Sequence, residues 1–396
     1  MPQENKKKER VKKMIKFGKW VVKFRIPILI LSFLLLIPTG IIYMNTRINY
    51  DILSYLPGDI ETMKGQDILL DEFGTGAFSV AVIDGMQEKE ISQLEDKLKE
   101  IDHVKDVLWY GALADISIPM DMLPDDLKDS LQNADTGSQL MIITFDTSMS
   151  ADETLDAIEE IRGLTNEQCL LSGMSAVVTD IKKICNSEVI MYVVIAAGLS
   201  ALVLALTMDS FLLPFIFLLS IGMAIVYNLG TNFIAGEISF VTQALAAVLQ
   251  LAVTMDYSIF LWHSYLENQE RYPDDKKRAM SHAISQTLTS VVGSSITTIA
   301  GFLAMCFMTF TLGMDLGIVM AKGVVFGVVG CVTILPAMIL AMDKWIEKTR
   351  HKAIIPDLGR IGGFVTKHYW IFIILFLVII GPAFYGQNHN QVYYDL

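Results

Sequence analysis

One carboxylic acid stands in the middle of an otherwise apolar stretch: Asp256, in LAVTMDYSIFLWH (251–263), directly before Tyr257. A carboxylate at the centre of a membrane-spanning helix costs about 2.5–3.5 kcal/mol on insertion scales. Burial disfavours the charged form of a carboxyl group, which lets such a group gain and lose a proton near neutral pH. We therefore interpret Asp256 as a proton carrier. The alternative is an acid that only hydrogen-bonds a neighbouring helix.

Polar and small side chains accompany this acid on two apolar segments. On its own segment they recur every seven residues, as Gln243, Gln250, Tyr257 and Ser264, with Thr254 nearby. The segment near 287–312 carries them at three- and four-residue spacing, as Ser290, Ser294, Thr297 and Gly301, with Ser295 and Thr298. Small residues allow close helix packing, and hydroxyls can hydrogen-bond a carboxylic acid. Packing and support of a proton relay both stay open for Ser294, Thr297 and Thr298.

Lys322 is the second charge inside an apolar segment. It lies about 12 Å inside the outer boundary at helical rise, so its ammonium can extend outward to the membrane surface. A pairing with Asp256 is the other possibility for this lysine. No phosphate-binding loop, nucleophile elbow or zinc-protease motif occurs, and no Cys/His spacing resembles a metal site. The sequence therefore predicts neither an enzyme nor a bound cofactor.

Seven apolar runs position these residues, near 26–44, 188–207, 211–230, 238–262, 287–312, 314–342 and 370–386. A helix needs about 20 apolar residues to cross a bilayer core. The composition agrees, because 53% of the 396 residues are hydrophobic and only 19% are charged. The first run lacks a convincing cleavage site, so we interpret it as a retained anchor. The sequence predicts a polytopic α-helical membrane protein with about seven transmembrane helices.

Basic segments orient the chain. Residues 1–25 carry ten lysines and arginines against two glutamates, and the connector 344–369 is also basic. Both belong in the cytoplasm by the positive-inside rule. The segment 45–187 then lies outside the cytoplasm, and its acidic clusters account for the net charge of -12 without a nucleic-acid partner. The remaining units are the first span (26–44), a bundle of spans two to six (188–343) and the last span with its exit (370–396).

The segment 45–187 has the pattern of an α+β unit. Its strands are expected at 77–84, 104–113, 138–146 and 169–173, and its helices at 88–101 and 150–164. The order β-α-β-β-α-β predicts a ferredoxin-like, split βαβ topology. From residue 174 a helix continues into the second span. Cys169 and Cys185 lie in this outer region, where a disulfide is permitted, but two free thiols are the favoured state.

Two further segments lead to predictions. The stretch 267–286 has the spacing of a separate amphipathic cytoplasmic helix between spans four and five. The exits of the first and last spans, NTRINYDIL (45–53) and NHNQVYYDL (388–396), both carry Tyr-Asp followed by Ile or Leu. This similarity predicts that a second repeat begins at 388 and that the chain is truncated there. Chance similarity of two interfacial segments is the alternative.

Three stretches together resemble a known family. AVTMDYSIFL (252–261), AISQTLTSVVGSSITTIAGFLAMCF (283–307) and GIVMAKGVVFGVVGCVTILPAMI (317–339) are similar to the fourth, fifth and sixth spans of MMPL-type transporters of the resistance-nodulation-division (RND) superfamily, amino-terminal half. The resemblance implies efflux by proton antiport, with export of lipids or other hydrophobic compounds. By resemblance Asp256 is the proton carrier and Tyr257 its hydrogen-bonding partner.

The same resemblance implies the setting of the protein. The outer α+β unit would be a porter domain, and the chain would be a multi-pass protein of a bacterial plasma membrane. Because the family has two such halves, the expected partner is a second half of the same transporter or a second copy of this chain. Two other functions share the helical core: a lipid- or sterol-sensing regulatory protein, and a protein-export accessory of the translocase-associated RND branch. A sensor has no need for a titratable acid inside the membrane.

Overall fold

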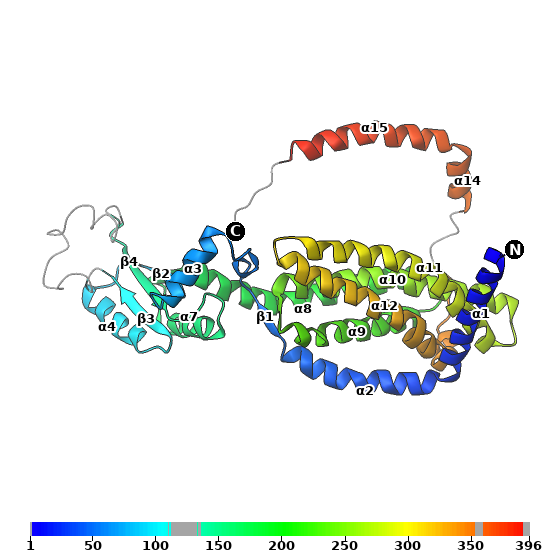
Figure 1. The fold of residues 1–396 in the computed structure, drawn as a ribbon, viewed down its shortest axis with the longest axis horizontal. Helices are drawn as coiled ribbons and strands as arrows, with labels where there is room; N and C mark the ends of the chain where they lie inside the picture. Colours follow the sequence, from blue (N-terminus) through cyan, green and yellow to red (C-terminus); the bar gives the residue numbers. More distant parts are fainter. Residues whose placement is uncertain (1, 110, 112–132, 134–135, 353–358, 391–396) are drawn as a thin grey trace.

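The computed structural model describes residues 2–109, 111, 133, 136–352 and 359–390. A bundle of long helices lies at one end of the molecule and a smaller sheet unit at the other (Figure 1). A single long helix, α8 (Met174–Thr207), runs from the last strand of the sheet unit into the bundle, as the sequence predicts.

Seven helical segments in the described part are long and apolar enough to cross a membrane. The helices that form them are α2 (Arg25–Met44), α8, α9 (Leu213–Gly230), α10 (Phe240–Arg271), α11 (Lys276–Ala304), α12 (Leu312–Ala341) and α15 (Tyr369–Asn388). Short 3-10 turns extend α9 (Asn232–Ala235) and α11 (Met305–Phe307). The chain is therefore a polytopic helical membrane protein.

Helix α12 occupies the middle of the bundle and contacts α2, α9, α10 and α11. Leu335 and Ile339 lie on the half of α12 that is predicted to be nearer the cytoplasm, and both are fully buried in the shared apolar core. Two shorter helices follow α12, namely α13 (Asp343–Lys348) and α14 (Gly359–Lys367). Helix α15 lies apart from the bundle (Figure 1), and its side chains are exposed along its whole length.

The basic segment 1–25, predicted only as a tail, forms the helix α1 (Pro2–Lys23). This helix packs against α11, with Val21 and Val22 buried in the bundle core. Gly18 lies directly on the backbone of Ser281, where an added Cβ would overlap the carbonyl group. The glycine therefore permits the close approach of the two helices.

The sheet unit contains all four predicted strands and both predicted helices. Its elements are β2 (Ala77–Ile83), α4 (Glu88–Lys99), β3 (Val104–Leu108), β4 (Gln139–Phe145), α7 (Asp152–Leu164) and β5 (Cys169–Ser172), preceded by a short 3-10 turn (Leu53–Tyr55) and α3 (Glu61–Asp71). The strand order is β3-β4-β2-β5, and every neighbouring pair is antiparallel. The second predicted strand ends at Leu108, and residues 110, 112 and 113 of that prediction lie outside the described residues.

The core of the sheet unit follows from the two periodicities of its sequence. Strand β2 alternates, with Ala81 and Ile83 buried among its inward positions. Helix α4 places Ile91 and Leu98 against the same core, and α7 adds Ile158. Both helices therefore cover the sheet through one shared apolar layer.

A second, two-stranded sheet joins the two parts of the molecule. Strand β1 (Arg47–Asn49) follows the exit of α2, and β6 (Glu237–Ser239) leads directly into α10. The two strands are parallel, with Ile48 beside Ile238. They bring together segments that are about half the chain apart in sequence.

One sequence-based prediction is corrected by the structure. The stretch 267–286 is not a separate helix, because α10 continues to Arg271 and α11 begins at Lys276. Helix α10 extends past the apolar run because Tyr265 and Asn268, which follow that run, are still buried against neighbouring helices. The favoured prediction for Cys169 and Cys185 is confirmed, because all four cysteines are free thiols, and Cys169 is buried in the sheet unit. Of the predicted second repeat at 388–396, residues 391–396 lie outside the described residues.

Candidate functional site

Asp256 lies on the face of α10 beside α11, and we call this the outward face of α10. A cavity of about 490 Å³ opens there between the two helices. Among its lining residues are Asp256, Phe260, His263 and Glu267 from α10, and Gln286 and Ser290 from α11. The side chains of Asp256, His263 and Glu267 are exposed at the surface of this chain. The structure thus places Asp256 on a face of α10 that this chain does not cover.

The carboxylate of Asp256 makes neither a hydrogen bond nor an ion pair with any other residue that the structure describes. The adjacent Tyr257 points elsewhere, because consecutive helical residues are about 100° apart. Its side chain is only 6% exposed and packs in the bundle core. Among the described residues, no hydrogen bond joins the side chains of Asp256 and Tyr257. The alternative of a purely structural acid would require a hydrogen bond from Asp256 to a neighbouring helix, and none is present among these residues.

A half-buried glutamine, Gln286, links α10 to α11 beside the cavity. The Oε1 atom of Gln286 accepts hydrogen bonds from Ser264 Oγ at 2.6 Å and from Asn268 Nδ2 at 2.7 Å. Ser264 and Asn268 are both buried on α10. Because an unpaired buried donor is unfavourable, this three-residue contact holds the two helices at one spacing.

The opposite face of α10 packs against α12 and α9, and we call it the inward face. Gln250 accepts a hydrogen bond from Asn228 Nδ2 at 3.0 Å, and both side chains are buried. A Cβ added at Gly323 would lie 2.7 Å from Asn228, and one added at Gly327 would lie 2.5 Å from Thr254 Oγ1. Two residues of the predicted polar region of α10, Gln250 and Thr254, are thus directed toward α12, where glycines make room for them, whereas Ser264 faces α11.

The predicted support residues of α11 lie on the same side as the cavity. Ser294 and Thr297 are exposed, and they follow Ser290 by about one and two turns. Thr297 and Thr298 donate hydrogen bonds to the carbonyl oxygen of Ser294, at 2.7 and 3.2 Å. These hydroxyls are therefore satisfied by their own helix and make no hydrogen bond to Asp256.

Lys322 does not pair with Asp256. Its ammonium donates a hydrogen bond to the side chain of Asn232, which follows α9. Tyr257, one residue beyond Asp256, lies level with Cys331, whose Sγ donates to the Tyr257 carbonyl oxygen. Nine residues of α12 separate Lys322 from Cys331, which is about 13 Å along the helix axis. The lysine thus belongs to the end of the bundle near the sheet unit.

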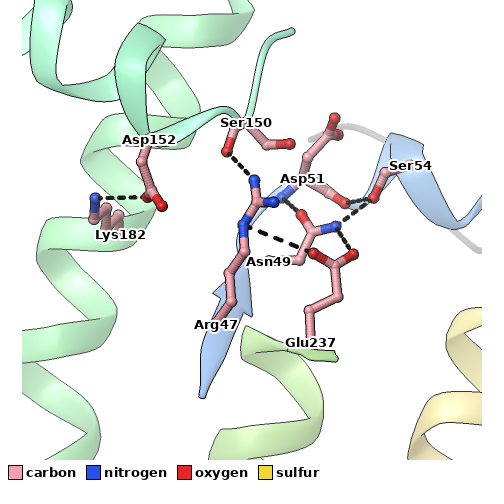
Figure 2. Close-up of polar contacts among 8 residues, drawn as sticks. All are labelled: Arg47, Asn49, Asp51, Ser54, Ser150, Asp152, Lys182 and Glu237. Carbon is pink, nitrogen blue, oxygen red and sulfur yellow. Dashed lines mark hydrogen bonds and ion pairs between the residues drawn. The ribbon is translucent and has the colours of Figure 1, made fainter. Parts of the chain in front are cut away.

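Sequence reasoning missed a polar junction at that end, shown in Figure 2. Asn49 Nδ2 donates to Glu237 at 3.0 Å and to Ser54 at 2.9 Å, while its Oδ1 accepts from the backbone N–H of Asp51 at 2.9 Å. Arg47 lies 3.8 Å from Glu237 and also donates to the backbone carbonyl of Ser150, just before α7. Three-residue strands are too short for a periodic signal, so no sequence pattern could have indicated this contact.

The same end of α10 is held by a second carboxylate. Asp315, in the first turn of α12, accepts from the backbone N–H of Ser239 at 2.9 Å and from Thr242 Oγ1 at 2.6 Å. Ser239 ends β6 and caps α10. Helix α10 is therefore attached at its start to both α12 and the sheet unit.

Fold and site together define a polytopic membrane protein with an unpartnered acid on a spanning helix. Residues 74–369, more than half of the chain, match the model of the MMPL family, and the chain belongs to that family. It is 25% identical over 295 residues to a putative membrane protein, SCO5905, of Streptomyces coelicolor, covering 69% of this chain and 35% of the relative. It is 24% identical to the probable transport protein MmpL12 of Mycobacterium tuberculosis, covering 72% and 24% respectively.

The chain therefore spans about a third or less of the length of these curated relatives. Among solved structures, SecDF from Thermus thermophilus, a translocon-associated membrane protein, aligns with 82% of this chain and 38% of its own. The TM-score is 0.45 and the sequence identity 15%. A second SecDF structure, in a super-membrane-facing form, gives a TM-score of 0.43 at 14% identity, with 83% and 39% covered.

Proposed function

We propose that this chain works as one half of a proton-motive-force-driven RND exporter of lipids or other hydrophobic compounds, with Asp256 as the proton carrier. The observation that carries the proposal is the free carboxylate of Asp256. It lies in an apolar spanning helix, beside a cavity of about 490 Å³, without a partner among the described residues. An intramembrane acid that the fold does not use is most simply kept for its protonation.

The exposed outward face supports a partner at this site. Asp256 and Phe260 on α10 and Ser294 and Thr297 on α11 would face lipid if nothing covered them. A second half of the same transporter, or a second copy of this chain, would enclose the cavity and the acid between them. Enclosure would remove bulk water, so that protonation of Asp256 responds to which side of the membrane reaches the cavity.

The other predicted site residues take unequal parts in this proposal. Tyr257 is assigned to the relay by family resemblance, although its ring is buried in the bundle core on another side of α10 from Asp256. Ser294, Thr297 and Thr298 would line the enclosed path. Lys322, bonded to Asn232, would act near the outer entrance rather than on the acid.

An apolar cavity of about 410 Å³ supports a hydrophobic substrate. It lies between α2, α9 and α12, and aliphatic and aromatic side chains such as Leu31, Leu35, Tyr227 and Phe326 line it. Its walls are almost entirely apolar, which suits an acyl chain better than a polar solute. The substrate class of the proposal, lipids or other hydrophobic compounds, rests on this cavity and on the family.

The sheet unit would be the extracytoplasmic, ferredoxin-like porter domain of such an exporter. Its strand order and its chain order β-α-β-β-α-β support this assignment. The ten basic residues of segment 1–25 support a cytoplasmic amino terminus in a bacterial plasma membrane. Movement of α10 would then reach the outer unit through β6 and its partner β1.

Transport by the full-length protein in proteoliposomes tests the proposal. The Asp256→Asn variant keeps the shape of the side chain but cannot ionise, so substrate export driven by a proton gradient should fall to background. The Asp274→Asn variant, which alters an exposed acid in the turn between α10 and α11, should transport like the wild type. Full proton-driven export by a folded Asp256→Asn protein would exclude the relay.

A further inference from the structure

A second cavity lies at the end of the bundle opposite the sheet unit, between α1 and the start of α11. Its volume is about 590 Å³. Six of its lining residues are basic: Lys19, Lys23 and Arg25 around the α1–α2 junction, and Lys277, Arg278 and His282 on α11. The cavity is therefore a concentration of positive charge formed by two segments that are about 250 residues apart.

The five lysines and arginines of this cavity have no carboxylate partner among the described residues. Their neighbour Lys276 shows the contrast, since its ammonium contacts both Asp343, at 2.7 Å, and Glu347. One acid, Asp275, does line the cavity. Its Oδ1 accepts from the backbone N–H of Arg278 at 2.9 Å and so caps α11. The positive charge of the cavity is thus left largely uncompensated.

The backbone segments that carry these cations are packed against each other. Gly18 of α1 lies against the backbone of Ser281, and Val22, which lines the cavity, is buried. The guanidinium of Arg278 lies 4.4 Å from the ring centroid of Tyr272. Because the two basic segments are already packed together, an anion that binds between them does not have to bring the two helices together.

We propose that this cavity binds the phosphate headgroup of an anionic phospholipid of the surrounding bilayer. Basic pockets between spanning helices at the cytoplasmic surface suit such headgroups, and arginine forms paired hydrogen bonds with phosphate oxygens. The position fits a lipid rather than a soluble phosphate: α2 enters the membrane directly from Arg25, with Ile26 and Ile30 exposed for acyl chains. Exposed Trp20 and Phe24 mark the same interface. The bound lipid would fasten α1 to α11, and this role is independent of the proton relay.

The test measures lipid binding by the full-length protein in detergent, with fluorescent phosphatidylglycerol and equally labelled phosphatidylcholine as probes. Phosphatidylglycerol should bind at least about tenfold more tightly, because clustered basic residues at the membrane surface attract an anionic headgroup. The quadruple variant K19Q/K23Q/K277Q/R278Q should abolish that preference. The matched control K12Q/K16Q/K344Q/K348Q removes four charges outside the cavity and should retain it.

Three outcomes would overturn the proposal. The first is that the quadruple variant keeps the preference for phosphatidylglycerol. The second is that the control variant loses as much of the preference as the quadruple variant, which would indicate general electrostatic attraction rather than a site. Alternatively, inorganic phosphate at constant ionic strength displaces the lipid probe, which would assign the cavity to a soluble anion. If the quadruple variant does not fold, the double variant K19Q/K277Q replaces it, with a loss of about threefold to tenfold in the preference expected.

Discussion

The two faces of helix α10 hold their polar groups in different ways. On the inward face, Gln250 and Thr254 meet glycines of α12 at distances that exclude even a methyl group. On the outward face, Asp256 lies beside a cavity of about 490 Å³ and has no partner in the described part of the chain. Close packing thus determines which residues fit on the inward face, whereas Asp256 on the outward face makes no polar contact with the described residues. This difference is the reason to assign function to Asp256 rather than to the more deeply buried polar residues.

The largest expected effect concerns close packing on the inward face. Gly327→Leu places a side chain onto Thr254, and overpacking of this kind costs about 1–3 kcal/mol or more. We expect a markedly lower Tm, or no folded protein, in a thermal unfolding assay of the detergent-solubilised protein. Gly293→Leu is the matched change on α11, where nothing lies within 4 Å of an added Cβ. Equal destabilisation by both would show that the two faces do not differ.

The link between α10 and α11 should give the next largest effect. Gln286→Ala removes the acceptor shared by Ser264 and Asn268 and leaves buried donors unpaired, at a cost of about 1–3 kcal/mol. The lower Tm should be accompanied by reduced export, because the spacing of the helices beside Asp256 is lost. A variant with unchanged Tm would mean that this contact does not hold the two helices together.

Two aspartates near α10 provide a direct contrast. Asp315→Asn weakens two hydrogen bonds that the charged carboxylate accepts, and we expect a loss of about 1 kcal/mol in the free energy of unfolding. Asp256→Asn removes no such contact and should leave the free energy of unfolding unchanged. Denaturation of the two variants under identical conditions makes the comparison. Destabilisation by Asp256→Asn as large as that by Asp315→Asn would reveal a structural role for Asp256.

The smallest expected effect concerns a carboxyl outside the membrane. Burial raises the pKa of Asp51 above its ordinary value, despite hydrogen bonds from the backbone N–H of Leu53 and from Ser54 that act in the opposite direction. Between the ordinary and the raised pKa the folded state binds more protons than the unfolded state, so stability falls as pH rises through this window. Asp51→Asn removes that loss and should raise the Tm slightly at pH 7, but not at pH 4. A lower Tm at pH 7 would contradict this account.

Long apolar segments and regular periodicity made most of the fold predictable. The seven spans follow from apolar runs of about 20 residues. In the sheet unit, the four strands follow from alternation with a period of two residues, and the two helices from a period of 3.6 residues. Boundaries failed where packing, rather than hydropathy, continues an element. Helix α10 extends eight residues beyond His263 because Tyr265 and Asn268 remain packed, although the apolar run has ended.

The residues of the candidate site could be proposed from the sequence, but their geometry could not. Asp256 can be identified from its chemistry alone, since an ionisable residue in an apolar segment is energetically costly and is therefore a candidate for function. Which face of α10 it occupies depends on how α11 and α12 pack, and neighbouring letters in the sequence do not contain that information. The sequence alone allowed Lys322 to pair with Asp256. In the structure the two residues lie at different levels along the axis of α12. The β1–β6 junction depends on a contact between distant segments and had no local signal.

Infrared difference spectroscopy of the full-length protein in proteoliposomes tests the central claim most directly. As the pH on one side of the membrane is changed during export, the account predicts a carboxylic acid C=O band that appears and disappears with turnover and is missing in Asp256→Asn. A turnover spectrum of the wild type without any band that depends on Asp256 would contradict the account.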